Sequence, residues 1–219
     1  MVPNVRPMSH SPQPPGLIID GPPTSRMVII LAHGAGAGMD SNFMNAFAVG
    51  LAGHGFRVVR FEFPYMAERR QSGKRRPPDR EPVLRQTWLQ VIGSIDAERL
   101  VIGGKSLGGR IASLIADEAE VAGLICLGYP FHPTGKSDQL RVEHLQAIET
   151  PTLILQGERD PFGSAAEVRD YKLSSQIRLR WLADGDHSFR PRALSGRTQE
   201  ANWRQAIEAI VDFIREREA

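Results

Sequence analysis

A serine, an aspartate and a histidine follow three separate apolar runs of this sequence, in that order along the chain. Ser106 comes after "LVIGG", Asp160 after "TLILQG" and His187 after "IRLRWL". A histidine beside a serine hydroxyl can remove its proton, and a carboxylate can orient the imidazole and stabilise the imidazolium that forms. The three residues therefore predict a serine nucleophile, with His187 as general base and Asp160 as its partner.

The segment around Ser106 has the pattern expected of an exposed nucleophile. Gly104-Lys105-Ser106-Leu107-Gly108 fits G-x-S-x-G, in which the serine occupies a strained turn between a strand and a helix. The two glycines relieve crowding at that turn, and the helix N-terminus favours developing negative charge. The pattern also arises by chance in a chain with 21 glycines, so its weight rests on the partner residues.

Each partner also has an ordinary structural alternative. Asp160 is able to shape a turn before a proline, and His187 to be an exposed loop histidine. Because both occur in the expected order after predicted strands, we favour the triad. Glu158, Asp184 and Asp186 are alternative acids. Asp186 adjoins His187 in sequence, which is a poor geometry for holding its ring, so we prefer Asp160.

A reaction at a carbonyl carbon also needs N–H donors for the negatively charged oxygen. We expect the backbone N–H of Leu107 to be one donor. The second is expected from the loop "HGAGAG" (His33–Gly38), with Ala35 first and Gly36 next. The alternative for this loop is phosphate binding, but it lacks the Lys-Ser/Thr of a P-loop and the spacing of G-x-G-x-x-G. We expect His33 to anchor the loop through a ring nitrogen rather than to act as a second base.

Strands and helices must alternate to place these residues together. Apolar runs predict a short edge strand at "LIID" and strands at "MVIILAH", "FRVVRFEF", "RLVIGG", "VAGLICLG", "PTLILQG" and "IRLRWL". Helical spacing predicts helices after Ser41, near 82–94, from Ser106 to about residue 119, around 164–174 and over about 198–217. A basic loop is expected after Pro64, and a looser segment at 129–150. The alternation predicts an α/β fold: a mainly parallel sheet of about seven strands flanked by helices, with its active residues at one edge.

Composition places the chain among ordinary globular proteins, with 41% hydrophobic and 24% charged residues. We predict a flexible Pro-rich tail at residues 1–15 and a single α/β domain at 16–219. A net charge of +2 gives no reason to expect nucleic-acid binding, and no apolar stretch is long enough for a membrane span. One cysteine and no secretory signal suggest a cytoplasmic protein. No cluster has metal-ligand spacing, so neither a metal nor another cofactor is expected. The oligomeric state stays open.

The motifs together resemble the α/β-hydrolase superfamily. "HGAGAG", "GGKSLGG", "GERDPFG" and "DGDHSF" stand in the order of that family. "RFEFPYM", "GKRRPP" and "LGYPFHPTGK" resemble its compact subgroup named after testis-expressed protein thirty, whose bacterial members include dienelactone-hydrolase-like proteins. The resemblance implies an α/β-hydrolase fold over nearly all of the chain after the tail. True dienelactone hydrolases use cysteine where this chain has Ser106, which puts a lactone substrate in doubt.

The expected substrate is a small ester or thioester. Only about 23 residues separate Gly128 from Thr152, too few for the independent lid domain that many α/β-hydrolases insert there. An open, shallow site without a lid domain is therefore expected, suited to small acyl groups. Aromatic and imidazole side chains near it are candidate walls, with core packing as the alternative for each: Tyr65, Tyr129, Phe131 and His132.

The loop Glu68–Arg80 carries six basic and two acidic residues. A solvated charged loop is one interpretation, and a dock for an anionic substrate or an acidic partner, through Arg75 and Arg76, is the other.

The sequence as a whole predicts a serine hydrolase that forms an acyl-enzyme intermediate with carboxylic esters or thioesters. The alternative is a non-catalytic binding or scaffold module on the same fold. The subgroup that the chain resembles includes a subunit of a histone-acetylating complex, and a fold does not by itself determine function.

Overall fold

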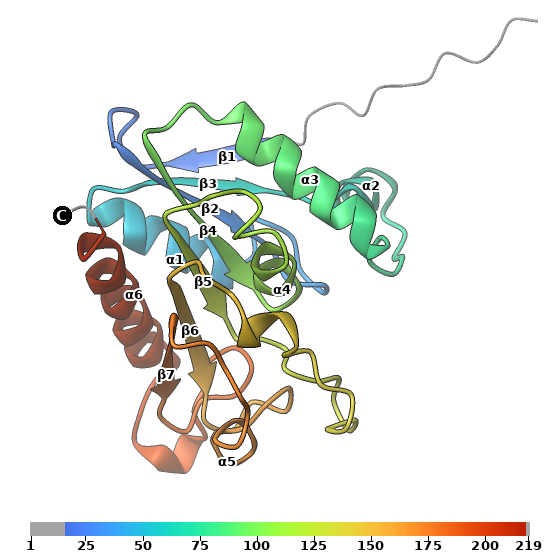
Figure 1. The fold of residues 1–219 in the computed structure, drawn as a ribbon, viewed down its shortest axis with the longest axis vertical. Coiled ribbons are helices and arrows are strands. Elements are labelled where there is room, and N and C mark those ends of the chain that lie inside the picture. The colour runs from blue at the N-terminus through green and yellow to red at the C-terminus, as the bar shows by residue number, and fades with distance from the viewer. Residues whose placement is uncertain (1–15, 218–219) are drawn as a thin grey trace, which may run out of the picture.

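A central sheet of seven strands organises the protein (Figure 1). The structure is a computed structural model that describes residues 16–217, so the predicted tail at residues 1–15 lies outside it. The strand order is β1-β3-β2-β4-β5-β6-β7, and all neighbours are parallel except β1 and β3. The strands are β1 (Leu17–Asp20), β2 (Met27–Ala32), β3 (Arg57–Phe61), β4 (Arg99–Lys105), β5 (Gly123–Leu127), β6 (Thr152–Gly157) and β7 (Ile177–Leu182).

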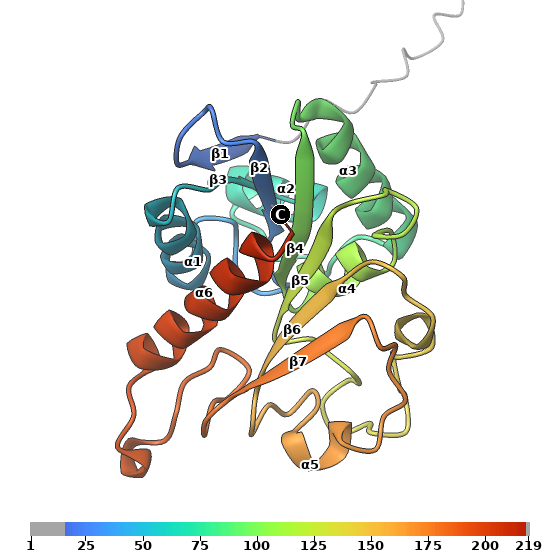
Figure 2. The ribbon, with the colours of Figure 1, turned by 60° about the vertical axis from the view of Figure 1, so that its left-hand side comes forward.

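Helices cover both faces of this sheet, which explains why its inner strands are apolar on both sides (Figure 2). In β2, Val28 and Ile30 belong to one buried cluster, whereas Ile29 and Leu31 belong to the other. The first cluster is covered by α2 (Pro64–Ser72), α3 (Glu81–Ser94) and α4 (Leu107–Ser113), and the second by α1 (Asn42–Gly53) and α6 (Gln199–Arg215). Burying one such aliphatic side chain stabilises the fold by about 1.5–3 kcal/mol.

Local signals fix most helix starts. Ser41 accepts a hydrogen bond from the Met44 N–H at the start of α1, and Thr198 does the same for Ala201 at the start of α6. The sequence predicts a basic loop after Pro64, but the structure has the helix α2 there. Proline is also favoured at the first helical position, where its missing N–H is not needed. Part of the expected basic loop is therefore helical.

Two helices are shorter than their apolar spacing predicts. α4 ends at Ser113 and continues as turns up to Glu120, which has a positive φ of 49°. α5 (Ala165–Val168) is a single capped turn. Residues 129–150 are irregular, as expected, with one short 3-10 helix at His144–Gln146. Among residues 16–217 no helix is both long and apolar enough to cross a bilayer.

The parallel direction of the strands sets where the candidate residues lie. β2, β4, β6 and β7 run the same way, so their carboxyl ends share one edge of the sheet. The "HGAGAG" loop, Ser106, Asp160 and His187 each follow one of these ends. Crossover connections thus bring residues more than 150 positions apart to the same edge.

Candidate active site

Ser106 occupies a strained turn between β4 and α4. Its backbone has φ 50° and ψ −112°, a conformation that non-glycine residues rarely adopt. A Cβ on Gly104 would lie 2.2 Å from the Ala32 carbonyl oxygen, and one on Gly108 would lie 2.5 Å from the same atom. Only glycine therefore lets β2 pass this close to the turn, which explains the two glycines of the G-x-S-x-G pattern.

Substituting Gly108 with alanine is expected to lower the free energy of unfolding by about 3 kcal/mol, because rigid backbone must move to admit the new methyl group. Urea unfolding measures the change. Gly93→Ala is the matched control, since a Cβ there meets no atom within 4 Å and alanine is the better helix former. An unchanged urea midpoint for Gly108→Ala would show that β2 does not crowd this turn.

Asp160 lies at the end of β6 with its carboxylate buried, and three donors hold it. Oδ1 accepts from the Phe162 N–H at 2.9 Å, and Oδ2 accepts from Gln156 Nε2 at 3.0 Å and from His187 Nδ1 at 2.8 Å. Gln156, which the sequence analysis did not single out, also accepts from the Tyr129 N–H at 2.7 Å. The carboxylate is therefore fixed in position, with its charge directed at the imidazole.

His187 is oriented for proton transfer at its outer nitrogen. Donation from Nδ1 to Asp160 leaves Nε2 with a free lone pair, which is the tautomer that a general base needs. Its side chain is 22% exposed, and the Phe162 ring packs 4.4 Å from the imidazole. Burial lowers the pKa of His187 below its ordinary value and so favours the neutral ring, although the bond to Asp160 opposes the shift.

The two halves of the predicted triad are not joined by a hydrogen bond here. Within residues 16–217, none links the Ser106 hydroxyl to the His187 ring. Such bonds are often long in unliganded active sites and tighten when substrate binds. The Asp160–His187 pair is thus seen directly, whereas proton transfer from Ser106 belongs to the proposal below.

The alternative acids have other partners. Asp186 accepts from the Ser188 and Arg190 N–H groups and so shapes its own loop. Asp184 pairs with Arg192 and Arg159, and Glu158 accepts from the Asp184 N–H. None of these three carboxylates is bonded to the His187 ring among the residues described, which favours Asp160 as its partner.

The glycine-rich loop after β2 lies against the nucleophile. A Cβ on Gly34 would be 3.7 Å from Ser106 Cβ. The Tyr65 hydroxyl lies 3.3 Å from the carbonyl oxygens of both Gly34 and Ala35, which ties the loop to α2. His33 accepts from the Phe63 N–H at Nε2 and donates from Nδ1 to the Gly34 carbonyl, so it anchors the loop in the expected manner.

The opposite donor begins the helix after the nucleophile. Leu107 is the first residue of α4, a position whose N–H has no acceptor within the helix. The loop residues Ala35 and Gly36 are exposed. Leu107 directly follows Ser106, and the loop that carries Ala35 and Gly36 approaches it at Gly34, so the oxyanion donors stay a prediction.

A protein-family model described as an alpha/beta hydrolase domain matches residues 25–215. The chain belongs to this family. Its fold is also that of an α/β serine hydrolase without a lid from Xanthomonas campestris, which is 20% identical with a TM-score of 0.68 over 91% of this chain and 88% of that chain. An α/β serine hydrolase homologue from Coxiella burnetii is 21% identical, with a TM-score of 0.61 over 91% and 90%. An esterase domain from Rhodothermus marinus is 14% identical, with a TM-score of 0.65 over 90% and 91%.

The predicted pocket walls lie inside this α/β-hydrolase domain. Tyr65, Tyr129, Phe131 and His132 are each at most 2% exposed. The Tyr129 hydroxyl donates to the Arg141 carbonyl at 2.9 Å, and the Phe131 ring packs 4.9 Å from that of Tyr129. The alternative of core packing therefore describes these side chains here. Phe162, partly exposed beside His187, is the aromatic side chain that the sequence analysis missed.

The predicted basic dock is partly occupied by internal partners. Arg76 forms ion pairs with Glu68 and Asp79, whereas Arg75 is exposed. Arg69 donates to the Gly36 carbonyl at 3.1 Å. The basic segment of the α/β-hydrolase domain therefore reaches the candidate oxyanion loop through Arg69.

Another serine, Ser113 in α4, does contact a histidine ring. Ser113 Oγ is 2.8 Å from His144 Nε2, and the same hydroxyl donates to the Arg110 carbonyl at 2.7 Å. The Ser113 proton is then already used, so His144 Nε2 must be the donor in the other bond. Because a protonated Nε2 cannot act as a base, the pair ties residues 129–150 of the α/β-hydrolase domain to α4.

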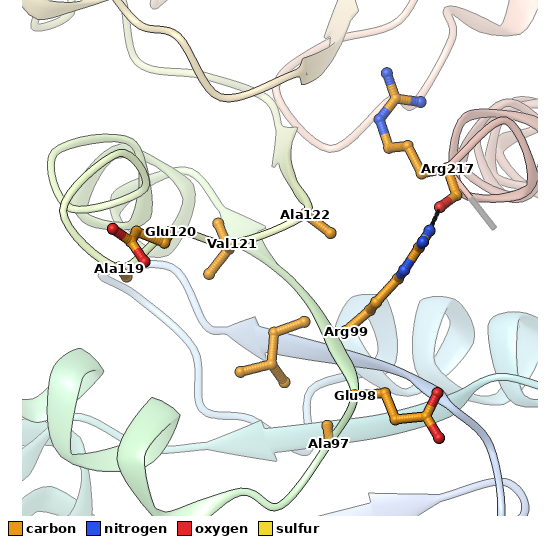
Figure 3. Close-up of a pocket in the computed structure, with 9 residues that line it drawn as sticks. Ala97, Glu98, Arg99, Ala119, Glu120, Val121, Ala122 and Arg217 are labelled. Carbon is orange, nitrogen blue, oxygen red and sulfur yellow. Dashed lines mark hydrogen bonds between the residues drawn. The ribbon is translucent and has the colours of Figure 1, made fainter. Parts of the chain in front are cut away.

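A cavity of about 390 Å³ lies at the opposite edge of the sheet (Figure 3). It is lined by the residues before and at the start of β4 and by those before β5, together with Arg217. The amino ends of the strands form this edge, so the cavity is separate from the candidate active site. Among residues 16–217 no group of three or more His, Cys, Asp or Glu side chains is arranged to hold a metal ion.

Proposed function

We propose that the protein is a serine hydrolase that cleaves carboxylic esters or thioesters through an acyl-enzyme intermediate. The observation that carries the proposal is the hydrogen bond from His187 to the buried Asp160 carboxylate, at the sheet edge where the strained Ser106 emerges. A base with the correct tautomer, a partly exposed serine in a strained turn and N–H donors beside it are the parts that acyl transfer requires.

The reaction has two halves in this proposal. Ser106 Oγ attacks the carbonyl carbon while His187 Nε2 takes the hydroxyl proton, and the N–H groups of Leu107 and Ala35 (or Gly36) stabilise the oxyanion. Collapse breaks the bond to the alcohol or thiol, which leaves with the proton from His187. Water then gives a proton to His187 and attacks the acyl-enzyme, and release of the carboxylic acid regenerates the Ser106 hydroxyl.

The short connection between β5 and β6 supports a preference for substrates with small acyl groups. Residues 128–151 hold no inserted domain, so nothing built from this segment encloses a long chain. Turnover of p-nitrophenyl esters is therefore expected to fall as the acyl chain lengthens from acetate to octanoate, and steady-state kinetics with a release burst test this. A strong preference for octanoate would contradict the open site, and no turnover of any ester or thioester would favour the binding-module alternative.

A further inference from the structure

The lysine beside the nucleophile is buried and has no part in the reaction above. Lys105 ends β4 directly before Ser106 and is 8% exposed. Its Nζ lies 5.3 Å from the centre of the Phe43 ring and 5.9 Å from that of Phe189. Burial deprives an ammonium group of its hydration, and methionine would fill similar space without that loss. Packing alone therefore does not explain why a charged residue occupies position 105.

The ammonium group makes its hydrogen bond to the loop that carries the base. Lys105 Nζ donates to the main-chain carbonyl oxygen of His187. Gly128, with φ 67°, leaves room for this contact, because a Cβ there would lie 2.8 Å from Nζ and 2.9 Å from the His187 oxygen. The neighbour of the nucleophile thus holds the residue that bears the imidazole.

We propose that Lys105 is a positioning residue, which fixes the His187 loop (residues 183–190) relative to Ser106. The inference rests on the proposed function, since it assigns Lys105 a role in aligning that base and nucleophile. Asp160 fixes the imidazole from the β6 side, and Lys105 fixes the backbone beneath it from the β4 side. Two independent contacts from two strands then determine where Nε2 lies, and an error of about 1 Å in such a position can cost 100-fold in rate.

The charges around Lys105 agree with this placement. Burial lowers the pKa of Lys105 to about 7, while Asp160 and Asp186, the facing carboxylates, favour its charged form. The Lys105 charge in turn lowers the pKa of His187. At acidic pH, where His187 takes up its proton, Lys105 is fully charged and this effect is greatest.

Lys105→Met is expected to lower kcat for a small ester about 100-fold with little change in KM, because it misplaces the base without touching the substrate. The acidic limb of the pH–rate profile is expected to move up by about one unit, since the positive charge beside His187 is gone. Lys136→Met, at an exposed position, is the matched control and is expected to change neither value. Urea unfolding of each variant checks that it folds.

A measurement independent of turnover separates this inference from the proposed function. Carbon-13 histidine labelling follows the His187 ring by NMR, with the signal assigned by its loss in His187→Ala. Lys105→Met is expected to raise the His187 pKa by about one unit and leave exposed His54 unchanged. That shift, in a protein without Ser106-dependent turnover, would overturn the proposed function and keep the positioning. An unshifted His187 would overturn the positioning, whatever happened to kcat.

Discussion

Replacing Ser106 with alanine is expected to lower the turnover of a small ester by about four to six orders of magnitude. The reason is that the hydroxyl is the atom that bonds to the acyl group, and no neighbouring side chain can replace it. The loss is expected in kcat, because the proposed oxyanion donors and the rest of the site are unchanged. Alanine keeps the Cβ, so the strained turn at φ 50° remains and the fold is expected to persist. Stopped-flow kinetics with p-nitrophenyl acetate would measure both the burst and the steady state.

Ser113→Ala is the matched control for Ser106→Ala. Ser113 lies in α4, the helix that follows Ser106, and its hydroxyl contacts the ring of His144. The substitution therefore removes a hydroxyl that contacts a histidine. Its turnover is expected to equal that of the unaltered protein, with a loss of about 1 kcal/mol in unfolding free energy from the missing hydrogen bonds. Equal turnover in Ser106→Ala, or a large loss in Ser113→Ala, would place the nucleophile elsewhere.

Asp160→Asn has the second largest expected effect, a fall in kcat of about 10⁴-fold. An amide that presents its N–H₂ to the imidazole forces the proton to Nε2, and His187 then has no lone pair to receive the Ser106 proton. The neutral amide also fails to stabilise the imidazolium that forms in the transition state. A pH–rate profile would measure the loss across the range where His187 is neutral.

Asp186→Asn distinguishes this explanation from a general effect of charge. Asp186 lies next to His187 in sequence and accepts two N–H bonds through Oδ1, which an asparagine oxygen can also accept. Its kcat is therefore expected to fall less than tenfold. If Asp186→Asn lost more activity than Asp160→Asn, the acid of the triad would be Asp186.

The double variant that combines Ser106→Ala with Asp160→Asn is expected to be no slower than Ser106→Ala alone, because the residues act as one unit.

The positions of the predicted nucleophile, acid and base could be inferred from the sequence, because each follows a strand that is recognisable from its apolar residues. Continuous apolar runs such as "MVIILA" and "GLICL" mark strands buried on both faces, and parallel strands must end at one edge. Ser106, Asp160 and His187 could be assigned to that edge without knowledge of any contact. The Asp160–His187 hydrogen bond is a tertiary consequence of that order.

The supporting residues were not predictable in the same way. Gln156 resembles any polar residue at the end of a strand, and only the folded structure shows it bonded to the carboxylate of Asp160. The Lys105 side chain lies against the Phe43 and Phe189 rings and bonds to the His187 carbonyl. These partners are distant in sequence, so the sequence alone does not predict them. Tyr129 was expected beside the site, but its hydroxyl finds an acceptor inside the protein, so its ring packs in the core.

A fluorophosphonate probe followed by peptide mass spectrometry tests the central claim most directly, that the side chains at 106, 160 and 187 form one nucleophilic site. The probe reacts with a serine whose proton a neighbouring base removes, and the modified peptide identifies that serine. One adduct is expected, on Ser106, and it is expected to disappear in His187→Ala protein that is still folded. An unlabelled folded protein, or an adduct on another serine, would contradict it.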